Sequence, residues 1–217
     1  MKKNISDYLL FYLLFLFFFA VFFLYHKHLV GNDSTISEWL INYLDDLKVK
    51  EFSVVGHSMG SLVAYRFAVD HPDRCRAIAL LGTSVPMPVT DVLLNAAADN
   101  DHAAIEMINT WSHSFQGKVG ANSNPGVWML GMGERLLERA TRGVLHADLG
   151  ACHSFAEVSH EVICPALVIA AGADLMTPAR AGLEVAKALP NAEIVNLDGC
   201  GHFMLSERPN DVLDALA

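Results

Sequence analysis

The hydrophobic and polar positions of this chain separate an apolar opening segment from a longer region in which short apolar runs alternate with amphipathic stretches. Runs with strand character lie at 52–55, 76–81, 166–171 and 193–197. Apolar runs that alternate with helical patterns are typical of a parallel sheet that helices cover on both faces. We therefore expect an α/β fold with about four parallel strands.

Helical patterns occupy intervals around these strands. One helix is expected to begin at Asp33 or Ser34 and to run to about Leu47, with its apolar residues on one face. A second helix follows the first strand and ends near His71, where a proline comes next. A third helix spans about 179–189, between the last two strands.

Residues 86 to about 160 depart from this rhythm, because they read as several helices without a clear strand. We expect helices over 91–100, 102–112 and 127–141, with a loop through 117–126. Six Met and aromatic side chains of this region are expected to pack between helices, with lining of a substrate pocket as the alternative. They are Met107, Trp111, Phe115, Trp128, Met129 and Met132.

The opening segment is long enough to cross a bilayer as a helix. Residues 8–25 read YLLFYLLFLFFFAVFFLY, without a charge or a helix breaker. Lys2 and Lys3 precede the segment and Lys27 follows it, which weakly favours a cytoplasmic amino terminus and an extracytoplasmic remainder. No small-residue cleavage site closes the run, so residues 1–30 are expected to form an uncleaved single-pass membrane anchor. The abrupt change in composition leaves one alternative, a non-native leader on a cytoplasmic protein.

The overall composition narrows the function classes. The chain has 217 residues, enough for one domain with a sizeable core, and its net charge of −9 argues against a nucleic-acid surface. Four scattered cysteines show neither a C-x-x-C pair nor metal-ligand spacing, so we expect buried thiols rather than a disulfide framework or a zinc site. They are Cys75, Cys152, Cys164 and Cys200. No metal, nucleotide or other cofactor is expected.

The residues with the clearest chemistry follow the first strand. Gly56-His57-Ser58-Met59-Gly60 matches the G-x-S-x-G nucleophile elbow, in the strand–turn–helix context that such an elbow requires. A serine hydroxyl is a weak nucleophile, and it must stand clear of the backbone within reach of a base. The turn is strained, so we expect Gly56 and Gly60 to lie where a Cβ would collide. By itself the motif is also compatible with an ordinary glycine turn.

Two candidate partners for this serine follow later strands. Asp174 comes after the third strand and His202 after the fourth, so both lie with Ser58 at the edge where sites form in parallel sheets. Taken singly, Asp174 could cap a helix near Thr177-Pro178, and His202 could be a surface loop residue. Together they follow the order Ser–Asp–His, which favours a catalytic set.

Three stretches together resemble the α/β-hydrolase fold superfamily, in its esterase, C–C hydrolase and haloperoxidase-like group. They are GHSMGS, the strand followed by G-A-D-x-x-T-P, and G-C-G-H-F-x-x-x-E-x-P. The resemblance implies a serine hydrolase that acts on a small ester-like substrate. It implies Ser58 as the nucleophile, His202 as the general base and then acid, and Asp174 as the residue that orients His202. The backbone N–H of Met59 would belong to the oxyanion hole.

The resemblance also implies a domain organisation, a truncated hydrolase domain over 31–217 with a helical cap inserted at about 86–160. Members of the group normally carry four strands and a helix before the elbow strand, with an H-G-type loop that donates one oxyanion N–H. Only 51 residues precede Phe52, and more than half of them, residues 1–30, belong to the expected anchor. We therefore expect 52–55 to be a sheet edge. The alternative function is a catalytically impaired homologue, either a membrane-tethered binding protein or a gene fragment.

Overall fold

A computed structural model describes residues 33–121, 126, 128–155 and 162–217. The expected membrane helix at 8–25, and the anchor at 1–30 to which it belongs, lie outside these residues. Within the described ranges, no helix is both long enough and apolar enough to cross a bilayer. Membrane attachment therefore stays a prediction.

The sheet has four parallel strands in the order β1-β2-β3-β4. They are β1 (Phe52–His57), β2 (Cys75–Leu81), β3 (Ala166–Ala171) and β4 (Ala192–Leu197). The predicted strands are confirmed, although β1 continues past residue 55 to His57. His57 pairs with Leu81 and Leu81 pairs with Ile169, so the carboxyl ends of neighbouring strands lie at one edge of the sheet.

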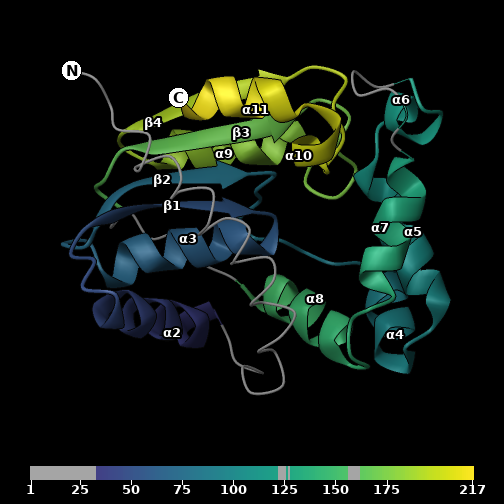
Figure 1. Cartoon of the computed structure of the whole chain (residues 1–217), viewed down its shortest axis with the longest axis horizontal. Helices are drawn as coiled ribbons and strands as arrows, with labels where there is room; N and C mark the ends of the chain where they lie inside the picture. Colours follow the sequence, from purple (N-terminus) through teal and green to yellow (C-terminus); the bar gives the residue numbers. More distant parts are fainter. Residues whose placement is uncertain (1–32, 122–125, 127, 156–161) are drawn as a thin grey trace.

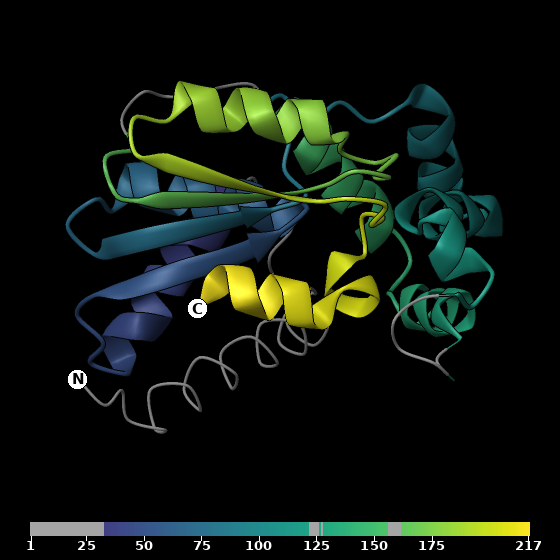
Figure 2. The same cartoon turned by 90° about the horizontal axis from the view of Figure 1, so that it is seen from above.

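Helices cover both faces of the sheet, as predicted. Ile78 and Leu80 of β2 contact one apolar core and Ala79 and Leu81 contact another, because alternate side chains of a strand point to opposite faces. The first core includes residues of α2 (Asp33–Asp46), α3 (Met59–Asp70) and α9 (Ala179–Ala188), and the second includes residues of α10 (Met204–Glu207) and α11 (Pro209–Leu216). Figure 2 shows α9 and α11 on opposite sides of the strands, and Figure 1 shows α2 on the outer side of α3.

The strand that leads to the elbow lies at an edge of the described sheet, as expected. Val54 and Val55 of β1 are only half-buried, whereas their partners Ile78 and Ala79 in β2 are 2% and 6% exposed. An apolar edge strand offers unpaired backbone groups to further strands. β1 is therefore less enclosed than its neighbour.

The region between β2 and β3 forms a helical cap beyond the carboxyl ends of the strands (Figure 1; teal and green in Figure 2). Its helices are α4 (Asp91–Asp99), α5 (His102–Ser112), α6 (Phe115–Lys118), α7 (Met129–Leu137) and α8 (Val144–Ser154). The side chains of Thr90, Asp101 and Ser114 accept backbone N–H groups and so cap α4, α5 and α6.

Two details of the cap differ from the sequence prediction. The helix expected over 127–141 ends at Leu137, because the chain turns there and reaches Gly143 at φ +86, where a glycine is favoured. α8 follows as a separate helix that the pattern did not resolve. The loop expected through 117–126 also overlaps the end of α6.

The expectation that the Met and aromatic side chains of the cap pack internally is correct for only part of the set. Met129 is buried, and Met107 and Trp111 pack against a cap core formed by α4, α5 and α8. The expectation is wrong for three others, which lie on outward faces of the cap. Phe115, Trp128 and Met132 are 77%, 68% and 50% exposed.

Candidate active site

The elbow forms the predicted strained turn between β1 and α3. Ser58 has φ 54 and ψ −122, in a region that residues other than glycine rarely adopt. Its N–H donates to the carbonyl of Leu81 at 2.9 Å, and the Ser61 hydroxyl donates to the Ser58 carbonyl at 2.6 Å. These backbone contacts hold the strained conformation at the carboxyl edge of the sheet.

The two glycines of the elbow play different parts. A Cβ on Gly56 would overlap the backbone carbonyl of Gly60, so the predicted need for glycine at position 56 is confirmed. The same prediction for Gly60 is wrong, because a Cβ there would meet no atom of another described residue within 4 Å. The close approach is made by the Gly60 carbonyl, while its Cα, in the first turn of α3, faces none of the other described residues closely.

Asp174 and His202 form a buried, directly bonded pair. His202 Nδ1 lies 2.7 Å from Asp174 Oδ2, and the two residues are 2% and 4% exposed. Asp174 Oδ1 also accepts the N–H groups of Met176 and Thr177 at 2.7 and 2.8 Å. Asp174 therefore accepts backbone N–H groups of the following turn, as a helix-capping residue would, and these bonds hold its carboxylate in place.

The charge state of Asp174 follows from these donors. Burial of the Asp174 carboxyl opposes its ionisation. The hydrogen bond from His202, the charge of His202 and the two donors of Thr177 outweigh burial, so the pKa of the carboxyl is lowered. With Nδ1–H of His202 donated to Asp174, Nε2 is left as the basic nitrogen. The pair is thus arranged to keep one tautomer of the imidazole.

Ser58 and His202 line the same cavity, of about 290 Å³. Both residues are described, yet no hydrogen bond joins the Ser58 hydroxyl to the His202 ring in this part of the structure. Catalytic hydrogen bonds are often long in ligand-free enzymes and tighten when substrate binds. The structure therefore joins Asp174 to His202 and places Ser58 on the cavity that His202 lines, without a direct bond between Ser58 and His202.

Met59 also lines this cavity, as its expected role requires. It is the first residue of α3, so its N–H has no acceptor within the helix and lies at the positive end of the helix dipole. An N–H in this position can stabilise developing negative charge next to Ser58.

His57 is a part of the site that the sequence analysis passed over. Its Nε2 lies 2.8 Å from the carbonyl oxygen of His202, and the two rings are 4.7 Å apart. Desolvation of the ring, together with the nearby His202, lowers the pKa of His57 to about 3. His57 is therefore neutral near pH 7, and its N–H can donate to the backbone beside His202. The G-x-S-x-G motif allows any residue at position 57, so the sequence did not indicate a role for His57.

Glu207 ties the His202 loop to the cap. The side chain is buried, and its two oxygens accept the N–H of Ser114 at 2.8 Å and the N–H of Gly201 at 3.0 Å. A Cβ on Gly201 would lie 2.7 Å from the carbonyl oxygen of Ser112. The His202 loop and the cap are therefore packed too closely for any side chain at position 201. Glu207 belongs to the G-C-G-H-F-x-x-x-E-x-P stretch, which indicated the residue but not its role.

The cap supplies much of the cavity wall. Ile108, Leu145 and Leu149 make the wall apolar, and Asp148 is a charged residue among its lining. A second hollow of about 690 Å³ adjoins the cavity and shares Leu136 with it. The further residues common to both are His57, Gly133, Phe203 and Leu205. The exposed residues Trp128 and Met132 line this outer groove, so for these two the pocket-lining alternative stays a prediction.

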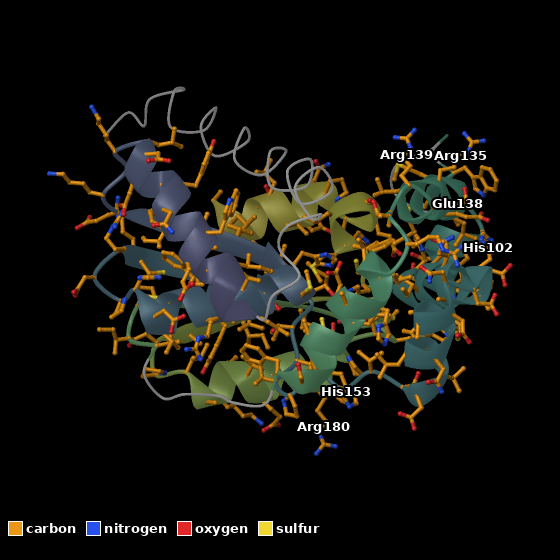
Figure 3. The ribbon with its side chains drawn as sticks, turned by 90° about the horizontal axis from the view of Figure 1, so that it is seen from below. His102, Arg135, Glu138, Arg139, His153 and Arg180 are labelled. Carbon is orange, nitrogen blue, oxygen red and sulfur yellow. The ribbon has the colours of Figure 1, made fainter. Side chains whose placement is uncertain are left out.

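One further cluster lies on the outer surface of the cap. Among the described residues, His102, Glu134 and Glu138 offer ligand atoms within 4.8 Å of one another. Nε2 of His102 faces Glu134 at 3.3 Å, while Nδ1 faces Glu138 at 3.9 Å. Figure 3 shows His102 and Glu138 in the cap, well away from the sheet. Because opposite ring nitrogens face the two carboxylates, the cluster resembles a surface ion pair and carries no metal assignment.

A parallel sheet whose strand ends carry Ser58, Asp174 and His202 beneath a helical insertion is the architecture of the α/β hydrolases. The sequence model of the Alpha/beta hydrolase family matches residues 28–215 of the chain. The chain therefore belongs to this family.

Individual relatives are similar at low identity. The pimeloyl-[acyl-carrier protein] methyl ester esterase of Chromobacterium violaceum is 29% identical over 174 residues, which cover 76% of this chain and 68% of the relative. The 2-hydroxy-6-oxononadienedioate/2-hydroxy-6-oxononatrienedioate hydrolase of Paraburkholderia phymatum is 28% identical over 185 residues, covering 78% of this chain and 63% of the relative. The chain spans 65% of the length of a carbamate hydrolase relative, 60% of a second 2-hydroxy-6-oxononadienedioate/2-hydroxy-6-oxononatrienedioate hydrolase and 70% of one uncharacterised hydrolase relative.

Solved structures show the same fold. A thermophilic esterase superposes with a TM-score of 0.73 at 24% identity, covering 86% of this chain and 71% of the esterase. A bromoperoxidase from Bacillus anthracis superposes with a TM-score of 0.70 at 16% identity, covering 85% of this chain and 72% of the bromoperoxidase. At these identities the similarity shows the fold alone.

Proposed function

We propose that this protein is a serine hydrolase that cleaves a carboxylic ester, or a similar acyl bond, of a small molecule. The observation that carries the proposal is the buried Asp174–His202 pair, joined at 2.7 Å, whose histidine lines the same cavity as Ser58. The strained elbow at Ser58 and the esterase and hydrolase names of the relatives support it.

The proposed mechanism follows the roles of a Ser–His–Asp set. His202 Nε2 takes the proton of the Ser58 hydroxyl as the oxygen attacks the carbonyl carbon, and the N–H of Met59 stabilises the oxyanion. His202 then passes the proton to the departing alcohol, and water cleaves the acyl-enzyme by the reverse sequence of proton transfers. Asp174 remains ionised throughout and stabilises the imidazolium. Every step uses groups of the chain and water.

The cavity also indicates a shape for the substrate. The inner cavity is largely apolar and includes Asp148, so it suits an apolar, uncharged part of a substrate. The outer groove includes Arg135 of α7 and Arg139 of the turn that follows α7, and both are exposed and point outward in Figure 3. An ester with an apolar chain and an anionic far end would place its charge near these arginines rather than near Asp148.

Paired substrates test this charge preference. Replacing Arg135 and Arg139 together by Ala should lower kcat/KM for an ester that ends in a carboxylate by about fivefold, since exposed ion pairs contribute about 1 kcal/mol. The corresponding neutral ester should be unaffected, and salt should reduce the difference. Arg142→Ala, an exposed arginine outside the groove lining, is the control. Equal losses for both esters would contradict the preference.

A catalytically impaired homologue that only binds a small molecule is the second candidate. Two observations favour it: β1 lies at the edge of the described sheet, and Ser58 makes no hydrogen bond to His202 within the described residues. Met59 is one oxyanion donor, and the loss of a single donor typically costs about 10² to 10³ in rate.

Active-site labelling separates the two candidates. The full chain, solubilised in detergent, is treated with a fluorophosphonate probe, which reacts with an activated serine. Labelling should occur in the wild type and in Ser154→Ala, which removes an exposed hydroxyl of α8, but not in Ser58→Ala. An ester panel then measures turnover. A folded wild type that does not label would support the binding protein instead.

Attachment to a membrane through residues 1–30 is part of the proposal. The full chain should stay with membranes after carbonate extraction, and protease protection would show on which side the hydrolase domain lies. Release of the chain into the soluble fraction would contradict the anchor and favour the non-native leader on a cytoplasmic protein.

A further inference from the structure

Two cysteines lie in contact at the amino-terminal ends of β2 and β3, whereas the candidate active site lies at the carboxyl ends of the strands. Cys75 is the first residue of β2, and Cys164 precedes β3, which lies next to β2. Their Sγ atoms are 3.9 Å apart although the residues are separated by 89 positions in sequence. Both lie on the amino-terminal side of the first paired residues of β2 and β3, whereas Ser58 follows the carboxyl end of β1.

The two thiols differ in exposure and in acidity. Cys75 is buried at 5% exposure, whereas Cys164 is half-buried and so has access to solvent. The hydrogen bond between the sulfurs lowers the pKa of Cys164 to about 7, and the same contact, with burial, raises the pKa of Cys75. A thiol next to a thiolate stabilises the anion, and the thiolate is the reactive form of cysteine.

The other two cysteines provide a contrast. Cys200 is buried, and burial raises the pKa of its thiol to about 12. Cys152 is buried in a different cluster, beside Leu62 and Met87. Cys164 is therefore the thiol that combines a lowered pKa with access to solvent, and Cys75 is in contact with it through the two sulfurs.

We propose that Cys75 and Cys164 form a redox modification site, at which a peroxide converts the two thiols into a reversible disulfide. The Cys164 thiolate attacks a peroxide oxygen, which gives a sulfenic acid and one water or alcohol after protonation. The Cys75 sulfur then attacks the sulfenic sulfur, the S–S bond forms, and the sulfenic oxygen leaves as water. Two electrons pass from the sulfurs to the peroxide, and a dithiol reductant reverses the change.

The geometry requires only a short approach. An S–S bond is about 2.05 Å long, so the sulfurs must close a gap of about 2 Å from their present contact, by side-chain rotation and small backbone shifts. Both side chains contact the same core cluster, so they already share one side of the sheet. Cys75 is where the chain enters β2, and Cys164 is where it returns to enter β3. In sequence, all the cap helices therefore lie between the two cysteines.

The disulfide is expected to act on stability rather than on chemistry. A bond that closes a loop containing α4 to α8 restricts the unfolded chain, and long loops gain most in the chain-entropy description. Because the pair lies at the opposite edge from Ser58, its oxidation should leave the reactivity of Ser58 unchanged.

The test compares oxidised and reduced full-length protein. After brief treatment with hydrogen peroxide, the wild type should lose two thiols and two hydrogen masses, and a non-reducing digest should contain a linked Cys75–Cys164 peptide. Its Tm should rise by roughly 5 °C or more, and a dithiol reductant should reverse the rise. Cys152→Ser, the matched control, should behave in the same way, whereas Cys164→Ser and Cys75→Ser should show neither the linkage nor the rise.

The peptide map of the wild type keeps the proposal testable even where a serine variant fails to fold. Gain of oxygen on Cys164 without the linked peptide would overturn it, as would a linkage only between two molecules. Loss of fluorophosphonate labelling together with linkage would show that the oxidised pair does reach the site, contrary to the expectation of unchanged Ser58 reactivity. The linkage does not depend on hydrolase activity, so either proposal can fail alone.

Discussion

The two halves of the candidate site have unequal structural support. Asp174 follows β3, which has a strand on each side, and its carboxylate is bonded to His202 and to the turn at Thr177. Ser58 follows β1 at the sheet edge, is half-buried, and is held through its backbone by Leu81 and Ser61. The acid–base half is thus held by many polar contacts, while the nucleophile half depends on a strained turn.

This difference shows which half should be more sensitive to change. A buried charged pair is costly to disturb, because removing one partner leaves the other without its hydrogen bonds. A strained turn persists only while its surroundings determine it. The changes below test the two halves separately and then the contacts between them.

Asp174→Asn should have the largest effect on activity. An amide in place of the carboxylate no longer holds the imidazole tautomer that leaves Nε2 basic, so kcat should fall by about 10⁴. Steady-state kinetics with an ester and a thermal melt would measure the change. Asp198→Asn, an exposed aspartate of the loop that precedes His202, should be neutral. An unchanged kcat would remove Asp174 from the proposed mechanism.

Gly56→Ala should weaken the nucleophile half. Its Cβ would overlap the Gly60 carbonyl, which is backbone and cannot rotate away, so the free energy of unfolding should fall by about 3 kcal/mol. Fluorophosphonate labelling should fall with it. Gly60→Ala is the matched control, since its Cβ would clash with none of the described residues and an alanine suits the first turn of α3. Denaturant unfolding that ranks the two variants the other way would refute this account of the elbow.

Glu207→Gln tests the contact between the His202 loop and the cap. The glutamine can offer only one oxygen to the N–H groups of Ser114 and Gly201, and its NH₂ group would face the other donor. The free energy of unfolding should fall by about 2 kcal/mol. Glu193→Gln, on the exposed surface of β4, is the control for charge loss. Equal stability of the two variants, measured in urea, would mean that Glu207 does not hold the loop.

His57→Gln should give the smallest effect near pH 7, and its effect should become visible as a pH dependence. The pKa of His57 is lowered from 6.5 to about 3 by desolvation of its ring. Because the folded pKa lies below the unfolded one, the unfolded state binds the extra proton first as pH falls below 6.5. Folding stability should therefore fall by roughly 1 kcal/mol per pH unit in that range.

The glutamine keeps an N–H donor for the His202 carbonyl but cannot titrate. The variant should therefore lose stability less steeply than the wild type between pH 6.5 and about pH 4, as followed by urea unfolding at each pH. His146→Gln, which changes an exposed histidine, should keep the wild-type slope. Parallel curves for His57→Gln and the wild type would show that His57 does not carry this proton linkage.

Local patterns predicted most of the sheet and the positions of the site residues. Residues 77–81 and 166–171 are continuous apolar runs, and such runs are typical of a strand that is covered on both sides. Asp174 and His202 were indicated because each stands directly after a strand, and the ends of parallel strands meet at one edge. The pattern was least informative in the cap, where α8 and the outward positions of Phe115, Trp128 and Met132 depend on how helices pack together.

The sequence by itself thus determined the α/β class, the elbow and the order Ser58–Asp174–His202, because apolar runs and turn residues act over a few neighbouring positions. Only the tertiary structure decided which distant groups meet. His57 reaches the His202 carbonyl across 145 positions, Glu207 reaches Ser114 across 93, and Cys75 reaches Cys164 across 89. Such contacts form when whole layers pack, and no short stretch of sequence specifies which remote side chain fills the space beside it.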